Sequence, residues 1–124
     1  MLFTRPLLTA YKKASTGITG LAVHPNPRAH LVSVYKDTLK SLERLPSHSV
    51  YRQATEALTS QRLGVVESTE DISKIEATLG AGQIEEVIVQ AEDEAKLVPE
   101  MEKWKAWEPL EEIPPKDQWK GFNQ

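Results

Sequence analysis

Apolar residues recur every three or four positions along much of this chain, and that spacing constrains the fold more than any other feature. The repeat is clearest between positions 27 and 45, where one stripe holds Leu31, Val34, Tyr35, Thr38, Leu39 and Leu42. This spacing places side chains on one face of an α-helix. Asn26 suits an N-cap before Pro27, and Pro46 stops a helix. The sequence therefore predicts a helix over 27–45.

A second helix is expected over 47–63, with Ser47 as its N-cap. Its inner face is predicted to consist of Val50, Tyr51, Ala54, Ala57 and Leu58. Because only Pro46 separates it from the first helix, the two are expected to be antiparallel neighbours.

Two more helices are expected in the second half of the chain. Ser68 begins a capping-box pattern, so a short helix should follow it and end at Leu79, before Gly80. Its inward residues are predicted to be Ile72, Ile75 and Leu79. A longer helix should begin near Gln83, and Pro99 is expected to limit or kink it.

These elements predict an all-α fold, a small up-and-down bundle of three longer helices plus one short helix. The bundle should occupy residues 25–98, between an N-terminal arm over 1–24 and an extended C-terminal docking tail over 99–124. No segment approaches the ~20 apolar residues of a membrane-spanning helix. Residues 1–13 contain three basic residues, several hydroxyl groups and no acid. That composition is typical of an organelle-targeting segment, and the alternative is an ordinary basic arm.

Few reactive groups are available for catalysis. The 124 residues include no cysteine, which excludes disulfides, cysteine-ligated zinc, iron–sulfur ligation and a cysteine nucleophile. The three histidines, His24, His30 and His48, lack a two-histidine metal spacing. Neither a G-x-S-x-G elbow nor a phosphate-binding glycine loop is present. We therefore expect no catalytic residue, no cofactor and no metal ligand.

Acidic residues gather on the helix that begins near Gln83, namely Glu85, Glu86, Glu92, Asp93 and Glu94. A small all-α enzyme could use a pair of these carboxylates for acid/base catalysis. Glu85 or Glu92 would then have to lie in a concave pocket. We expect instead a convex, solvated helix face, or a face directed at a basic partner.

Charge is distributed unevenly along the chain. Residues 1–63 carry a net charge of +6 and residues 64–124 a net charge of −9, which gives −3 overall. Either the surface is electrostatically polarised or the two halves pack together and neutralise each other. The basic residues of the first half lie outside any recognised nucleic-acid-binding motif, so no nucleic-acid partner is expected.

The last 26 residues are rich in tryptophan and proline. All three tryptophans, Trp104, Trp107 and Trp119, lie there. Each carries roughly 150–250 Å² of surface that can be buried, so it should pack on the bundle or fill a pocket on another protein. Proline stiffens the segment and lowers the entropy lost on docking. The predicted partner-binding residues are Trp104, Trp107, Glu108, Pro109, Leu110 and Trp119.

Several blocks of sequence resemble the alpha-subcomplex subunit 5 family of mitochondrial NADH:ubiquinone oxidoreductase, respiratory complex I. The more specific blocks are Gly82-Gln83-Ile84-Glu85-Glu86-Val87-Ile88 and Trp107-Glu108-Pro109-Leu110. The others are Thr16-Gly17-Ile18-Thr19-Gly20-Leu21, Leu39-Lys40-Ser41-Leu42, Tyr51-Arg52 and Gln118-Trp119. Ala106 departs from the family, in which many members have proline at this position.

The resemblance implies a helical-bundle accessory subunit without a redox centre of its own. Such a subunit lies peripherally on the matrix side of the mitochondrial inner membrane and supports assembly and stability of the matrix arm. Its partners would be other complex I subunits, especially core subunits of the quinone module, with no small-molecule substrate. A soluble assembly factor or adaptor that leaves after its task is the alternative.

Overall fold

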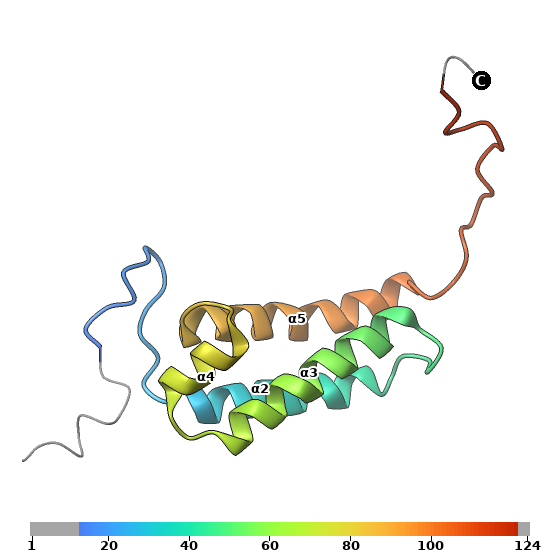
Figure 1. Cartoon of the computed structure of the whole chain (residues 1–124). Coiled ribbons are helices and arrows are strands. Elements are labelled where there is room, and N and C mark those ends of the chain that lie inside the picture. Colours follow the sequence, from blue (N-terminus) through green and yellow to red (C-terminus); the bar gives the residue numbers. More distant parts are fainter. Residues whose placement is uncertain (1–12, 122–124) are drawn as a thin grey trace, which may run out of the picture.

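The computed structural model describes residues 13–121, and four α-helices lie within that span. They are α2 (Pro27–Leu42), α3 (Val50–Ser68), α4 (Ile72–Leu79) and α5 (Ile84–Trp104). The most extensive helix contacts join α2 to α5 and to α3, while α4 packs on α3 and α5 (Figure 1). The predicted all-α bundle of three longer helices and one short helix is confirmed.

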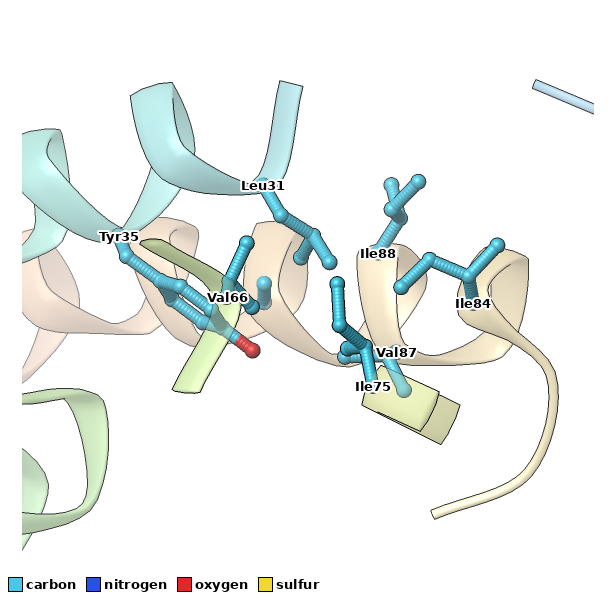
Figure 2. Close-up of a cluster of buried hydrophobic side chains, with 8 residues drawn as sticks. Leu31, Tyr35, Val66, Ile75, Ile84, Val87 and Ile88 are labelled. Atoms are coloured by element: carbon cyan, nitrogen blue, oxygen red, sulfur yellow. The ribbon is translucent and has the colours of Figure 1, made fainter. Parts of the chain in front are cut away.

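The hydrophobic core consists of two clusters at opposite ends of α2. The larger cluster surrounds the start of α2 and of α5 (Figure 2), and its buried members are Leu31, Tyr35, Val66, Ile75, Ile84, Val87, Ile88 and Ala91. The smaller one consists of Leu42, Leu45 and Val98, with Tyr51, Met101 and Trp107 packed against them. Each fully buried leucine, isoleucine or valine stabilises the fold by about 1.5–3 kcal/mol.

Two of the predicted helix starts were wrong. Ser49, not Ser47, caps α3, and its side chain accepts a hydrogen bond from the Arg52 backbone N–H at 3.3 Å. Helix α3 then continues to Ser68, so this serine ends one helix and does not cap the next. Asp71 caps α4 instead, because its carboxylate accepts from the Ser73 N–H at 3.0 Å.

Helix ends also differ from the expectation. Helix α2 ends at Leu42, and tighter turns carry the chain to Leu45. Helix α5 continues through Pro99 to Trp104, so the proline does not end it. Proline removes one backbone donor, but Val98 before it belongs to the smaller cluster and Met101 after it packs against that cluster. We attribute the continuation of the helix to this packing, which outweighs one lost hydrogen bond.

The predicted inner face of α3 was wrong for four of its five residues. Thr55, Thr59 and Val66 are the buried residues of α3. Val50 and Leu58 are 77% and 50% exposed, and Ala54 and Ala57 are also exposed. Among the predicted inner residues, Tyr51 alone packs on the core. It shares a helix face with Thr55, Thr59 and Val66, so anchoring by Tyr51 and Val66 turns the predicted stripe outward.

The N-terminal arm is bound to the start of α5 from Lys13 onward. The Lys13 ammonium lies 2.5 Å from Glu85 Oε1, and the His24 backbone N–H donates to Glu85 Oε2 at 3.3 Å. Nearby, Gln83 Nε2 donates to the Thr16 carbonyl at 2.6 Å. The arm is therefore tied to the bundle through Gln83 and Glu85. Residues 1–12, which carry most of the predicted targeting segment, lie outside the described residues.

Glu85 is a buried carboxylate, with 2% of its surface exposed. Burial by itself would raise its pKa, but hydrogen bonds from Lys13 and from backbone N–H groups, together with the lysine charge, hold the pKa below the ordinary value. The ionised form is therefore the one that the fold stabilises. The prediction of a solvated face does not hold for this residue.

We expect Glu85→Gln to lower the free energy of unfolding near neutral pH by about 1–3 kcal/mol, because the substitution leaves a buried site without its charge-assisted hydrogen bonds. Because the folded-state pKa is lowered, this contribution is complete above pH 4.5 and is lost as the pH falls through the folded-state pKa. Urea unfolding of both proteins across pH would measure it. Asp93→Asn, at an exposed position of α5, is the matched control. A difference that stays constant down to pH 3 would contradict the assignment.

Two tyrosines on facing helices provide a second test. Among the described residues, the buried Tyr35 hydroxyl makes no hydrogen bond of good geometry and has only the Arg62 guanidinium nearby, whereas the Tyr51 hydroxyl donates to Glu94 Oε1 at 2.5 Å. Removing an unpaired hydroxyl is close to neutral, while removing a bonded one costs about 0.5–1.5 kcal/mol or more when the partner is charged. We expect Tyr35→Phe to maintain or raise the free energy of unfolding and Tyr51→Phe to lower it. Equal losses in both variants would refute this.

Candidate docking site

The C-terminal segment leaves the bundle through a sharp turn after α5. Lys105 ends the helix in the left-handed conformation, with φ of 50°, and the Glu108 N–H donates to the Lys105 carbonyl at 2.9 Å. This turn directs Trp107 back against the smaller core cluster of Leu42, Leu45 and Val98. Trp107 is thus partly buried by its own chain, which fixes the point at which the tail begins.

Beyond Trp107 the chain extends away from the helices (Figure 1). The described tail residues form isolated turns, in which Gln118 N–H donates to the Pro115 carbonyl and Lys120 N–H to the Asp117 carbonyl. Every residue from Glu108 to Gly121 is exposed. The tail therefore has no packing partner of its own among these helices.

The exposed tail is apolar as well as acidic. Ile113 and Trp119 are 93% and 90% exposed, and Leu110 is 71% exposed. Trp104, on the last turn of α5, is also exposed. Large apolar side chains left in water forgo on the order of 25 cal/mol per Å² of stabilisation. An apolar partner surface would recover it.

The six predicted partner-binding residues separate into two groups. Trp104 and Trp107 lie at the end of α5 and in the turn after it, whereas Glu108, Pro109, Leu110 and Trp119 lie in the exposed segment. Trp104 belongs to a helix, where sequence reasoning placed it in an extended chain. The proline pattern that suggested an early helix end could not reveal the packing of Val98 and Met101.

The acidic face of α5 shows little that prepares it for catalysis. The Glu85 carboxylate is occupied by Lys13 and His24, and its pKa is lowered, so it is a poor proton donor near neutral pH. The Glu92 carboxylate lies 2.8 Å from His30 Nε2 and accepts a hydrogen bond from that ring nitrogen. In residues 13–121 no group of three or more histidine, aspartate or glutamate side chains is placed to hold a metal ion.

Glu92 also lines an open groove between α2 and α5, so the expected convex surface was wrong here. The groove has a volume of about 250 Å³, and its lining residues are Val34, Asp37, Glu92, Ala95 and Lys96. The carboxylates of Asp37 and Glu92 both remain in contact with solvent. Catalytic carboxylate pairs are typically set apart by different degrees of burial, and that contrast is missing between Asp37 and Glu92.

The two oppositely charged halves of the chain neutralise each other in part. Three ion pairs among the described residues join residues 1–63 to residues 64–124: Lys13–Glu85, Lys36–Glu67 and Arg44–Glu102. A contact between His30 and Glu92 joins the same two halves. Arg28 is also engaged, since its guanidinium donates to the carbonyls of Val66, Glu67 and Thr69 at the end of α3. The structure favours packing between the halves over a polarised basic surface.

Within residues 13–121, no helix has both the length and the apolar character needed to cross a bilayer.

Comparison with known proteins gives one consistent result. A family model described as "ETC complex I subunit conserved region" matches residues 20–86. The chain is 49% identical over 119 residues to NADH dehydrogenase [ubiquinone] 1 alpha subcomplex subunit MCI4 of Candida albicans, covering 95% of this chain and 86% of the relative.

Similarity extends to animals and plants. The chain is 47% identical over 108 residues to NADH dehydrogenase [ubiquinone] 1 alpha subcomplex subunit 5 of Mus musculus, covering 87% of this chain and 93% of the relative. It is also 47% identical over 103 residues to a probable mitochondrial subunit 5 of Arabidopsis thaliana, covering 83% of this chain and 60% of the relative. These matches show that the chain belongs to the alpha subcomplex subunit 5 family of complex I.

Proposed function

We propose that this protein is a non-catalytic accessory subunit of mitochondrial complex I that supports the assembly and stability of the matrix arm. Membership of the alpha subcomplex subunit 5 family supports the assignment to complex I. Electron transfer from NADH to ubiquinone would then take place on other subunits. We place the protein peripherally on the matrix side of the inner membrane, against core subunits of the quinone module.

The observation that carries the mechanism is the exposed apolar C-terminal segment on a well-packed bundle. Trp107 fixes the start of the segment to the core, while Trp119 and Ile113 are almost fully exposed. Tryptophan is a typical anchor of protein interfaces, where one buried side chain can contribute 2 kcal/mol or more. Proline at positions 109, 114 and 115 restricts the free segment and lowers the entropy lost when it docks.

The tail binds apolar pockets on neighbouring subunits, and charged residues such as Glu108 set its register. The bundle presents the tail at a defined position, because α5 continues to Trp104 and Trp107 packs beside it. An assembly factor that leaves the complex would use the same surface only transiently. A permanent subunit would instead migrate with the large membrane assembly.

We expect Trp119→Ala to reduce incorporation into complex I at least ten-fold while the melting temperature of the isolated chain stays unchanged, because this side chain is 90% exposed. Native gels of mitochondria in which the variant replaces the resident protein would measure incorporation. Trp119→Phe is the matched control and should retain most of it.

Trp107→Ala should behave differently, because it removes packing within the chain as well as a docking anchor. We expect it to lower both the melting temperature and incorporation. Normal incorporation of a Trp104→Ala/Trp119→Ala double variant would contradict docking through the tail. Absence of the wild-type chain from the purified assembly would contradict a permanent subunit.

A further inference from the structure

The first part of the tail carries negative charge that no other described residue neutralises. Residues 107–115 include three acids and no base, and the acids are Glu108, Glu111 and Glu112. All three are exposed, and none of their carboxylates forms an ion pair with another residue of 13–121. Acidic residues of the bundle such as Glu67 and Glu102 do form such pairs. The charge of the tail is therefore available to a partner.

Proline gives the same segment a preferred backbone conformation. Pro109, Pro114 and Pro115 each fix φ near about −65°, and a residue that precedes a proline favours an extended backbone. Among the described residues, no backbone N–H from 109 to 117 donates to another backbone group. A polyproline II helix has this backbone, since it contains no internal hydrogen bonds and turns once every three residues.

A period of three separates the apolar side chains of the segment from the acidic ones. Trp107, Leu110 and Ile113 follow one another at intervals of three, so a polyproline II helix places them in one row. The three glutamates fall in the two remaining rows, on either side of the apolar one. In a β-strand, with its period of two, Leu110 and Ile113 would point to opposite sides. The threefold conformation therefore gives one apolar face with carboxylates along both edges.

The carboxylates indicate the chemistry of the surface that covers this face. A groove that takes up the apolar row also brings the glutamates close to its edges, and opposite charge there fixes the register and speeds encounter. A membrane surface rich in anionic lipid would repel the segment. The bundle is not the partner in this structure, because the segment extends away from it (Figure 1).

We propose that residues 107–115 dock as a polyproline II helix in an apolar groove of a neighbouring complex I subunit, and that lysine or arginine side chains form the edges of that groove. Leu110 and Ile113, which are 71% and 93% exposed, enter the groove. Proline sets the docking conformation in advance, which lowers the entropy lost on binding. This inference rests on the proposed function, because it requires the chain to be part of the assembly.

Removal of the three negative charges tests the basic edges. We expect Glu108→Gln/Glu111→Gln/Glu112→Gln to reduce the incorporated fraction of the chain at least ten-fold, measured on native gels of mitochondria in which the variant replaces the resident protein. The matched control, Glu43→Gln/Glu70→Gln/Asp93→Asn, removes the same number of charges at exposed positions of the bundle. It should incorporate nearly as well as the wild-type chain. Both isolated variants should keep a melting temperature close to that of the wild type.

An exchange of neighbouring residues tests the threefold period. Leu110→Glu/Glu111→Leu keeps the composition and net charge of the chain but moves a leucine off the apolar row and puts an acid in it. We expect incorporation to fall at least five-fold. Leu110→Ile/Ile113→Leu is the matched control, because it exchanges two residues within the row, and it should retain most of the incorporation.

The remaining outcomes each overturn the inference. Equal incorporation of the two charge variants, whether high or low, would refute basic edges, and undiminished incorporation of Leu110→Glu/Glu111→Leu would refute the threefold face. A lower melting temperature of the isolated glutamine variant would show that the segment binds its own bundle. Sedimentation of the isolated chain with phosphatidylcholine vesicles, lost in the Leu110→Glu/Glu111→Leu variant, would identify a lipid surface instead.

Failure of the inference can be told apart from failure of the proposed function. If the wild-type chain migrates with complex I and Trp119→Ala lowers its incorporation, the results above refute only the conformation of the segment and the charge of its partner. Absence of the wild-type chain from the assembly would refute the proposed function as well.

Discussion

Burial of α2 between α3 and α5 is the constraint on which the rest of the structure depends. Leu31, Tyr35, Thr38 and Leu42 are buried along it, and both core clusters include residues of this helix. Because α2 is in contact with both long neighbours, it sets how α3 is turned about its axis and where α5 ends. The arm is bound near the beginning of α5, and Trp107 is bound near its end.

The ionic contacts between the two halves of the chain follow the same packing of helices. The acidic second half of the chain supplies partners to the basic first half, at Glu85, Glu92, Glu67 and Glu102. Most of these pairs are partly exposed and contribute little stability individually, about 0–1 kcal/mol. The Lys13–Glu85 pair is different, since its carboxylate is buried and hydrogen-bonded. The acidic residues weighed above as catalytic candidates, Glu85 and Glu92, therefore bind the arm and α2.

The bundle and the tail differ in how far they bury their apolar side chains. The bundle satisfies its own core and leaves the large apolar side chains of the C-terminal segment uncovered, together with Val50 and Leu58 on α3. Large contiguous exposed apolar surfaces commonly mark sites that other molecules cover. Under the proposed function, the uncovered apolar side chains would contact neighbouring subunits, and the packed bundle would hold them in position.

Local sequence was enough to establish the helical class, the four helices within residues 13–121, the glycine stop after Leu79 and the family, because these depend on local periodicity, turn chemistry and contiguous blocks such as Gly82–Ile88. It also predicts the three tryptophans near the C-terminus as partner-binding residues. The folded chain alone revealed the caps at Ser49 and Asp71, the helical course through Pro99, the burial of Glu85 and the outward turn of Val50 and Leu58. These features depend on contacts between residues far apart in the chain. An apolar stripe says that one face of a helix favours an apolar neighbour, but it does not say whether that neighbour belongs to the same chain.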